Sequence, residues 1–245
     1  DSELPIIEQI AKQAEINGVE GVRAISGADA RAIEPQLRAI AALDVPVSGI
    51  IDSHGYMFAL QGEIEARGGA VVLNAPFAGA AQHAEGFQVR LADAEATQIT
   101  TRALIVSAGL DAQTCAEAIE PYPKSRIPKL YLGKGNYFAL AGFKAPFSKL
   151  IYPTPIPGAL GTHYRRDLGG VARFGPDLEW VEHTDYRVDP ARAQSFYETV
   201  RKFWPGLPDN ALVPDYAGIR PKIHGPGSKQ PDFMIDDPAA HGVEG

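Results

Sequence analysis

The fold is decided by the stretch Ala103-Leu104-Ile105-Val106-Ser107-Ala108-Gly109-Leu110. Its first four residues are apolar, which is typical of a strand buried on both faces of a sheet. Small residues follow, and glycine tolerates backbone conformations that larger residues avoid. We interpret the stretch in one of two ways. It is a core strand that ends in a tight turn, or a strand whose Ala108 and Gly109 let a flat or phosphorylated cofactor approach the backbone.

The segments on either side alternate between helical and extended patterns. Apolar spacing, capping residues and Gly or Pro stops predict helices over residues 4–17, 26–34, 52–69, 112–119 and 190–203. Short apolar runs predict strands at residues 70–73, 87–91, 103–106 and 233–235. From about residue 127 the chain is β-rich, with strands expected near residues 127–140, 150–152, 160–166 and 171–174. The order indicates an α/β fold of mixed α and β elements.

Composition excludes several classes of function. The chain has 245 residues and a net charge of −7, which disfavours a nucleic-acid surface because phosphate binding needs clustered Lys and Arg. No apolar run reaches the ~20 residues of a bilayer span, so we expect no membrane span. The single cysteine, Cys115, fits a reducing compartment, and we expect a cytoplasmic protein.

Familiar catalytic motifs are missing from the sequence. The six histidines form no His-x-His or His-x-x-x-His pair, so their spacing predicts no metal site. The sequence contains neither a Gly-x-Ser-x-Gly elbow nor a phosphate-binding Gly-x-x-x-x-Gly-Lys-Ser/Thr loop. These absences leave isolated polar residues as the candidates for chemistry.

Three residues stand in settings that suit catalysis or binding. His54 follows Asp52-Ser53 at a predicted helix start, where the helix dipole disfavours a cationic imidazole, although Asp52 and Ser53 also suit simple capping. His163 lies in a strand pattern that places it on the same face as Arg165, as a catalyst or as an ordinary strand histidine. Arg220 follows a small, apolar stretch and precedes Pro221, which suits a fixed guanidinium that grips a carboxylate.

Several segments together resemble a known family. In chain order they are Gly49–Asp52, Gly68-Gly69, Ala103–Gly109, Lys134–Phe138, Tyr152-Pro153, Leu160–His163, Gly175-Pro176 and Gly218–Pro221. This series resembles the FAD-dependent oxidoreductases of the D-amino-acid-oxidase-like superfamily, and within it the L-2-hydroxyglutarate dehydrogenase/oxidase branch. The resemblance runs over nearly the whole chain.

The resemblance implies a two-part architecture and FAD as the cofactor. We expect part of a glutathione-reductase-like FAD-binding domain and a mixed β-sheet substrate domain, divided as residues 1–123, 124–220 and 221–245. Phe77, Ala108 and Gly109 would lie against the adenosine-diphosphate part of FAD. Arg220 matches the position of a substrate-carboxylate arginine. Because strand alternation places Tyr137 and Lys134 on opposite faces, only one of them is expected to bind the far end of the substrate.

The implied reaction is oxidation of a small 2-hydroxy acid by hydride transfer to the flavin, with His163 or His54 accepting the hydroxyl proton. Oxidation of an amino or imino acid is the alternative on the same fold, since both substrates carry a carboxylate. A non-catalytic binding module is the alternative of another class. The family's Gly-x-Gly-x-x-Gly segment and its last FAD-contacting segment are absent from these 245 residues, so we expect an excerpt of a longer protein.

Overall fold

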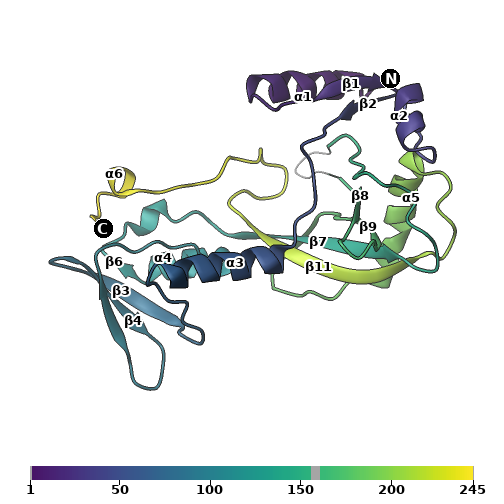
Figure 1. Cartoon of the computed structure of the whole chain (residues 1–245). Coiled ribbons are helices and arrows are strands. Elements are labelled where there is room, and N and C mark those ends of the chain that lie inside the picture. Colours follow the sequence, from purple (N-terminus) through teal and green to yellow (C-terminus); the bar gives the residue numbers. More distant parts are fainter. Residues whose placement is uncertain (1, 156–160, 245) are drawn as a thin grey trace. The chain divides into compact units, whose positions relative to one another are not determined.

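The computed structural model describes residues 2–155 and 161–244, and the chain divides into two compact units. Unit 1 consists of Asp1–Asp52 and Gly133–Ile219, and unit 2 of Ser53–Leu132 and Arg220–Gly245. Each unit contains helices and strands, so the predicted mixed α and β class is confirmed (Figure 1). The predicted domain division at residues 123 and 220 stays a prediction.

The first part of unit 1 contains two helices and a two-stranded antiparallel sheet. The elements are α1 (Leu4–Ile16), β1 (Arg23–Ser26), α2 (Gly27–Ile33) and β2 (Ala41–Asp44), and β1 pairs antiparallel with β2. Ser26 and Asp29 form a capping box, in which the Ser26 hydroxyl accepts a hydrogen bond from the Asp29 N–H and the Asp29 carboxylate accepts one from the Ser26 N–H. This reciprocal pair explains why α2 begins where the sequence predicts.

A five-stranded sheet forms the centre of unit 1. Its strands are β7 (Tyr131–Leu140), β8 (His163–Arg166), β9 (Ala172–Gly175), β10 (Glu179–Val181) and β11 (Leu212–Lys222). Their order is β10-β7-β9-β8, and β11 also pairs with β7. The strand expected at residues 150–152 is reduced to one bridge, between Ile151 and Tyr164. Residue 160, where another strand was expected to begin, lies outside the described residues.

One face of this sheet packs against α5 (Ala193–Phe203), which follows the short helix η3 (Pro190–Arg192). Phe196, Val200 and Phe203 recur at helical spacing and are buried, as the sequence predicts. They join Phe138, Tyr164 and Phe174 of the sheet in one core, with Phe147 and Trp204 beside them. The sheet residues that alternate with these core positions therefore point away from α5.

Glu34, at the end of α2, connects the two chain stretches of unit 1. Its side chain is buried, and Oε1 accepts hydrogen bonds from Ser148 N at 2.8 Å, Ser148 Oγ at 2.6 Å and Lys149 N at 2.6 Å. Arg38 adds two bonds from its guanidinium to the carbonyl oxygens of Arg201 and Lys202. A buried carboxylate is tolerated here because its donors come from backbone and hydroxyl groups fixed in place.

Replacing Glu34 by alanine is expected to lower the free energy of unfolding by about 3 kcal/mol, because three donors lose a charged acceptor inside the protein. Urea denaturation of the variant beside the unchanged protein measures the difference. Glu198→Ala is the matched control, since the Glu198 carboxylate forms an exposed bond with Gln194 on α5. Equal stability losses in the two variants would contradict the role given to Glu34.

Unit 2 contains a four-stranded sheet and the longest helix of the chain's described part, α3 (Ser53–Ala66). The sheet order is β5-β4-β3-β6, with antiparallel pairs except for the parallel pair of β3 with β6. The strands are β3 (Phe77–His83), β4 (Gly86–Leu91), β5 (Gln98–Thr101) and β6 (Ile119–Glu120). The helices are η1 (Gly109–Asp111), α4 (Ala112–Glu117), η2 (Lys124–Arg126) and α6 (Pro238–His241).

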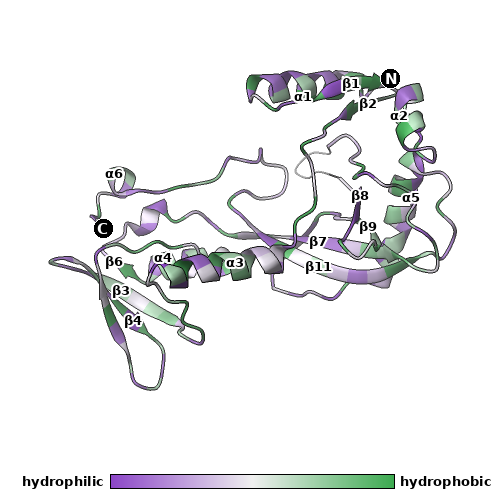
Figure 2. Ribbon diagram, viewed as in Figure 1, coloured by the Kyte–Doolittle hydropathy of each residue, from purple (hydrophilic) through white to green (hydrophobic). Residues whose placement is uncertain are grey.

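Three predicted strands of unit 2 are wrong. Residues 70–73, 103–106 and 233–235 have no strand conformation, and their side chains include Leu73 at 78% exposed, Ile105 at 87% and Phe233 at 94%. A strand needs neighbours that take up its backbone hydrogen bonds, and no strand in the described residues pairs with these segments. Apolar side chains of α3 are exposed in the same unit, among them Met57 and Phe58. Figure 2 shows hydrophobic residues along the α3 ribbon.

The C-terminal segment of unit 2 is anchored at Asp236. Its carboxylate accepts hydrogen bonds from the Tyr122 hydroxyl and from Arg126, with Nε of Arg126 at 2.8 Å from Oδ2. The Arg126 guanidinium, and then the Tyr122 hydroxyl, hold the pKa of the Asp236 carboxyl well below its ordinary value. Asp237 caps α6 just beyond this anchor.

The attachment of this segment is expected to weaken in acid. A carboxylate with a lowered pKa in the folded state contributes stability above the ordinary pKa of about 4, and that contribution is lost as the pH falls through the lowered value. Hydrogen exchange of residues 236–244, corrected for the intrinsic effect of pH, should therefore accelerate below pH ~4. In Asp236→Asn exchange should already be fast at neutral pH, whereas Asp232→Asn should match the unchanged protein. If the exchange rate of these residues changes neither with pH nor in Asp236→Asn, the claim that Asp236 holds the segment in place is wrong.

Candidate functional site

His163 lies at the start of β8, opposite Gly175 of β9, on the sheet face that points away from α5. The side chain is buried, with 6% exposed. The Tyr152 ring stacks on the imidazole with ring centres 4.4 Å apart, and the Tyr137 ring meets it edge-on at 6.5 Å. The imidazole is thus held in one orientation by two aromatic rings, which suits a group that must meet a substrate in a fixed position.

Gly175 fixes the position of Tyr137. Its φ is +142°, a conformation rare for residues with a side chain, and a Cβ there would lie 2.7 Å from Cδ1 of Tyr137 and 2.6 Å from the carbonyl oxygen of Asn136. Only glycine lets β9 pass this close to β7. The Gly175-Pro176 segment is one of those that resemble the family, and Gly175 lets the Tyr137 ring lie beside His163.

The predicted shared face of His163 and Arg165 is confirmed, because both contact Tyr137. The Arg165 guanidinium lies over the Tyr137 ring at 5.2 Å and over the Tyr216 ring at 5.4 Å, and it donates a hydrogen bond to the Tyr216 hydroxyl. The two tyrosine rings stack with centres 4.6 Å apart. We name this group the aromatic cluster: Tyr137, Tyr152, His163, Arg165 and Tyr216, all in unit 1.

Sequence reasoning missed Tyr216 as a member of this cluster. The residue reaches Tyr137 because β11 pairs with β7, two strands far apart in the sequence. The sequence offers one signal for it: Tyr216 lies four residues before Arg220, a spacing that places both side chains on the same face of a strand. Burial raises the pKa of the Tyr216 hydroxyl, so this group stays neutral at physiological pH.

Lys134 lies among different partners from Tyr137. Its Nζ donates to the carbonyl oxygen of Arg187 at 2.7 Å and lies 3.9 Å from Glu179 Oε2. Neighbouring Asn136 donates to Asp177 and Glu179. Lys134 therefore belongs to a buried polar network, and its role as a substrate ligand stays a prediction. Of the two candidates for the far end of the substrate, Tyr137 is the one beside His163.

Arg220 lies in unit 2, near the end of β11, and its side chain is exposed. Alternation places Lys222 on the same side of the strand, and the pKa of Lys222 is lowered by burial and then by the charge of Arg220. Among the described residues Arg220 forms no ion pair with an acidic side chain. An arginine without a carboxylate partner, beside a second cation, is a setting that attracts an anionic ligand.

The remaining predicted site residues also lie in unit 2. His54 is exposed in the first turn of α3. Phe77 begins β3 opposite Leu91, and its side chain packs on the small core of this unit. Ala108 and Gly109 are exposed where η1 begins; Gly109 has a φ of +59°, and a Cβ there would meet no atom within 4 Å. The backbone at this turn is unobstructed, which fits a cofactor that lies against it.

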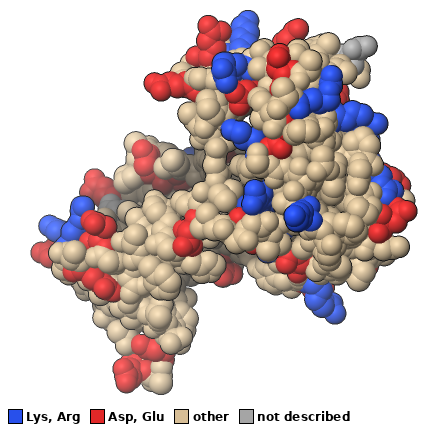
Figure 3. All heavy atoms as spheres, turned by 45° about the vertical axis from the view of Figure 1, so that its right-hand side comes forward, with Lys and Arg blue, Asp and Glu red and all other residues tan. Residues whose placement is uncertain are grey.

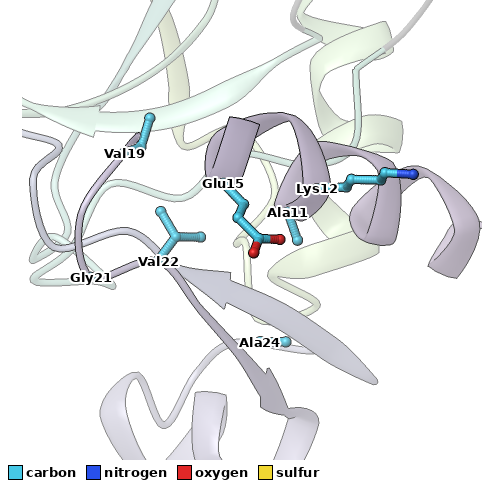
Figure 4. A pocket seen from close by; sticks show the side chains of 7 residues that line it. All are labelled: Ala11, Lys12, Glu15, Val19, Gly21, Val22 and Ala24. Carbon is cyan, nitrogen blue, oxygen red and sulfur yellow. The ribbon is translucent and has the colours of Figure 1, made fainter. Parts of the chain in front are cut away.

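Other surface features contain none of the predicted site residues. A shallow pocket lies between α1 and residues 19–24, and Glu15 and Ala11 point from the helix into it (Figure 4). Acidic and basic side chains are interspersed on the face drawn in Figure 3. In the described ranges no three His, Cys, Asp or Glu side chains gather as a metal site would require. No helix of these ranges is both long and apolar enough to cross a bilayer.

Comparisons with known proteins agree with this architecture. Residues 1–244 match the family described as FAD dependent oxidoreductase, DAO. The chain is 36% identical over 283 aligned residues to the mitochondrial L-2-hydroxyglutarate dehydrogenase of Arabidopsis thaliana, an alignment that covers 100% of this chain and 59% of the relative. The chain therefore belongs to the FAD-dependent oxidoreductase family, as predicted, and FAD is the cofactor of that family.

Solved structures show the same fold. The FAD-bound L-alpha-glycerophosphate oxidase of Mycoplasma pneumoniae superposes with a TM-score of 0.74 at 16% identity, covering 90% of this chain and 59% of that one. The L-proline dehydrogenase of P. horikoshii gives 0.73 at 15% identity, covering 96% and 61%. The chain thus spans about 60% of the length of each of these three proteins.

Proposed function

We propose that the protein oxidises an L-2-hydroxy acid of the 2-hydroxyglutarate kind, with FAD as the cofactor. The observation that carries the proposal is the fixed, buried His163 of the aromatic cluster, in a chain that is 36% identical throughout its length to an L-2-hydroxyglutarate dehydrogenase. Oxidation of an alcohol requires a group that accepts the hydroxyl proton, and a histidine suits that task near neutral pH.

Each residue has a separate task in this reaction. When bound, FAD would supply the redox chemistry, which is hydride uptake from Cα of the substrate. His163 accepts the proton of the hydroxyl group, which becomes the carbonyl oxygen of the product; His54 is the alternative acceptor. Arg220 binds the C1 carboxylate and so fixes the orientation of Cα. Phe77, Ala108 and Gly109 would hold the adenosine-diphosphate part of the cofactor.

A substrate panel tests the proposal. The purified FAD-loaded full-length protein is mixed without oxygen with L-2-hydroxyglutarate, D-2-hydroxyglutarate, L-glutamate, L-proline or glycine, and the loss of oxidised-flavin absorbance is followed. Rapid bleaching by L-2-hydroxyglutarate is the expected result. Bleaching only by an amino or imino acid would move the reaction to the C–N bond. A protein that binds no flavin would favour the non-catalytic module. The predicted cytoplasmic location stays a prediction.

A further inference from the structure

We propose that Arg165 binds the second carboxylate of a dicarboxylic substrate, so that the aromatic cluster selects 2-hydroxy diacids over 2-hydroxy monoacids. The inference rests on the proposed function, which gives His163 the hydroxyl group and Arg220 the first carboxylate. On one face of the sheet two arginines lie opposite each other, Arg165 of β8 and Arg173 of β9.

The two opposed arginines differ in their partners. Arg173 is neutralised twice, by ion pairs with Asp167 and Asp215. Arg165 has no ion pair among the described residues; its hydrogen bond there goes to the neutral hydroxyl of Tyr216, and its buried Nε has no acceptor. A partly buried cation without a counter-charge is costly, and a functional anion is the simplest reason to keep one.

The contacts of Arg165 leave its hydrogen-bonding capacity largely unused. The Arg165 guanidinium carbon lies 5.2 Å from the ring centre of Tyr137 and 5.4 Å from that of Tyr216. A guanidinium has five N–H donors, which lie in its plane and match the two oxygens of a carboxylate. The two ring contacts and the single hydrogen bond to Tyr216 therefore hold the group while other donors remain for a ligand. Because the side chain is only half-buried, a ligand has access to it.

The position of Arg165 relative to His163 gives the size of the ligand. One residue separates His163 from Arg165 on β8, so their Cα atoms lie about 7 Å apart at the usual rise of a strand. Both lie against the Tyr137 ring. This separation suits a molecule in which two or three carbons lie between the alcohol carbon and a second carboxylate. The substrate class is therefore a short-chain 2-hydroxy dicarboxylate.

Binding of two unreactive acids to the FAD-loaded full-length protein tests the inference. Glutarate and valerate share a five-carbon chain, but valerate has one carboxylate instead of two. Their dissociation constants are measured by calorimetry for the unchanged protein, Arg165→Gln, Arg165→Lys and the matched control Arg166→Gln. Arg166 is the next residue on β8 and lines a separate shallow pocket with Leu140 and Lys144.

The unchanged protein and Arg166→Gln are expected to prefer glutarate over valerate by about tenfold or more, the range of a charge-assisted hydrogen-bonded pair. Arg165→Gln should lose this preference and keep its affinity for valerate, and Arg165→Lys should retain part of it. An unchanged glutarate affinity in Arg165→Gln would overturn the inference. Equal losses for both acids would also overturn it, because they would mean a structural role.

Turnover separates this inference from the proposed function. If the unchanged protein does not oxidise L-2-hydroxyglutarate but Arg165→Gln still loses only glutarate binding, the reaction is wrong and the diacid site stands. If the unchanged protein oxidises L-2-hydroxyglutarate and L-2-hydroxyvalerate with equal kcat/KM, and Arg165→Gln alters neither value, the reaction stands and the diacid site is wrong.

Discussion

Replacing Arg220 by lysine is expected to raise the KM for the 2-hydroxy acid by about 10- to 100-fold and to lower kcat as well. A lysine keeps the charge but loses the two parallel hydrogen bonds with which a guanidinium grips a carboxylate. We expect kcat to fall as well, because a carboxylate held by a single hydrogen bond can rotate and move Cα out of the reactive geometry. Arg220→Gln, which also removes the charge, should be affected more strongly.

Steady-state kinetics of the FAD-loaded full-length protein measure this change. Arg67→Lys is the control from the same unit, because Arg67 forms an exposed ion pair with Glu63 on α3. Its KM should equal that of the unchanged protein. An unchanged KM in Arg220→Lys would remove Arg220 from the substrate site, and the exposed guanidinium would then need a different anionic partner.

Replacing His163 by alanine is expected to lower kcat by about 10²- to 10⁴-fold, the usual contribution of a positioned general base. The KM should change much less, because in this proposal the carboxylates of the substrate are bound by arginines. The acidic limb of the kcat/KM profile should also disappear, since the group whose protonation causes it is gone. Stopped-flow measurement of flavin reduction isolates the chemical step.

His54→Ala is the matched comparison for this experiment. If His163 is the proton acceptor, His54→Ala keeps both the rate and the acidic limb. The reverse pattern assigns the role to His54 at the start of α3. A full rate in His163→Ala excludes His163 whatever the result for His54. Thermal unfolding of each variant shows whether loss of the Tyr152 stacking has altered the fold instead of the chemistry.

The sequence predicts the local elements of this protein better than its long-range pairs. The capping box of Ser26 and Asp29 and the apolar stripe of α5 depend on residues within a few positions, so both helices form where expected. The runs at 70–73 and 103–106 have the composition of buried strands, but strand formation depends on partners that composition does not specify. An apolar run alone therefore does not predict that a strand forms or which strand it pairs with.

The same distinction applies to the candidate site. Alternation along β8 correctly predicts that His163 and Arg165 share a face, and alternation along β7 separates Tyr137 from Lys134. The stacking of Tyr137 on Tyr216 could not be predicted, because it requires the register of two strands distant in sequence. Tyr216 gives Arg165 a second aromatic contact and a hydrogen-bond acceptor, beyond the contact with Tyr137.

The bonds from Glu34 to Ser148 and Lys149 also constrain the order of events during synthesis. The two partners are 114 residues apart, so at 5–20 residues per second a ribosome needs roughly 6 to 23 s to deliver Ser148 after Glu34. During that interval Ala30 and Leu37, which belong to the core of unit 1, have no sheet to pack against. Residues 1–52 therefore lack part of their packing partners until residues 133–219, the second half of unit 1, are made.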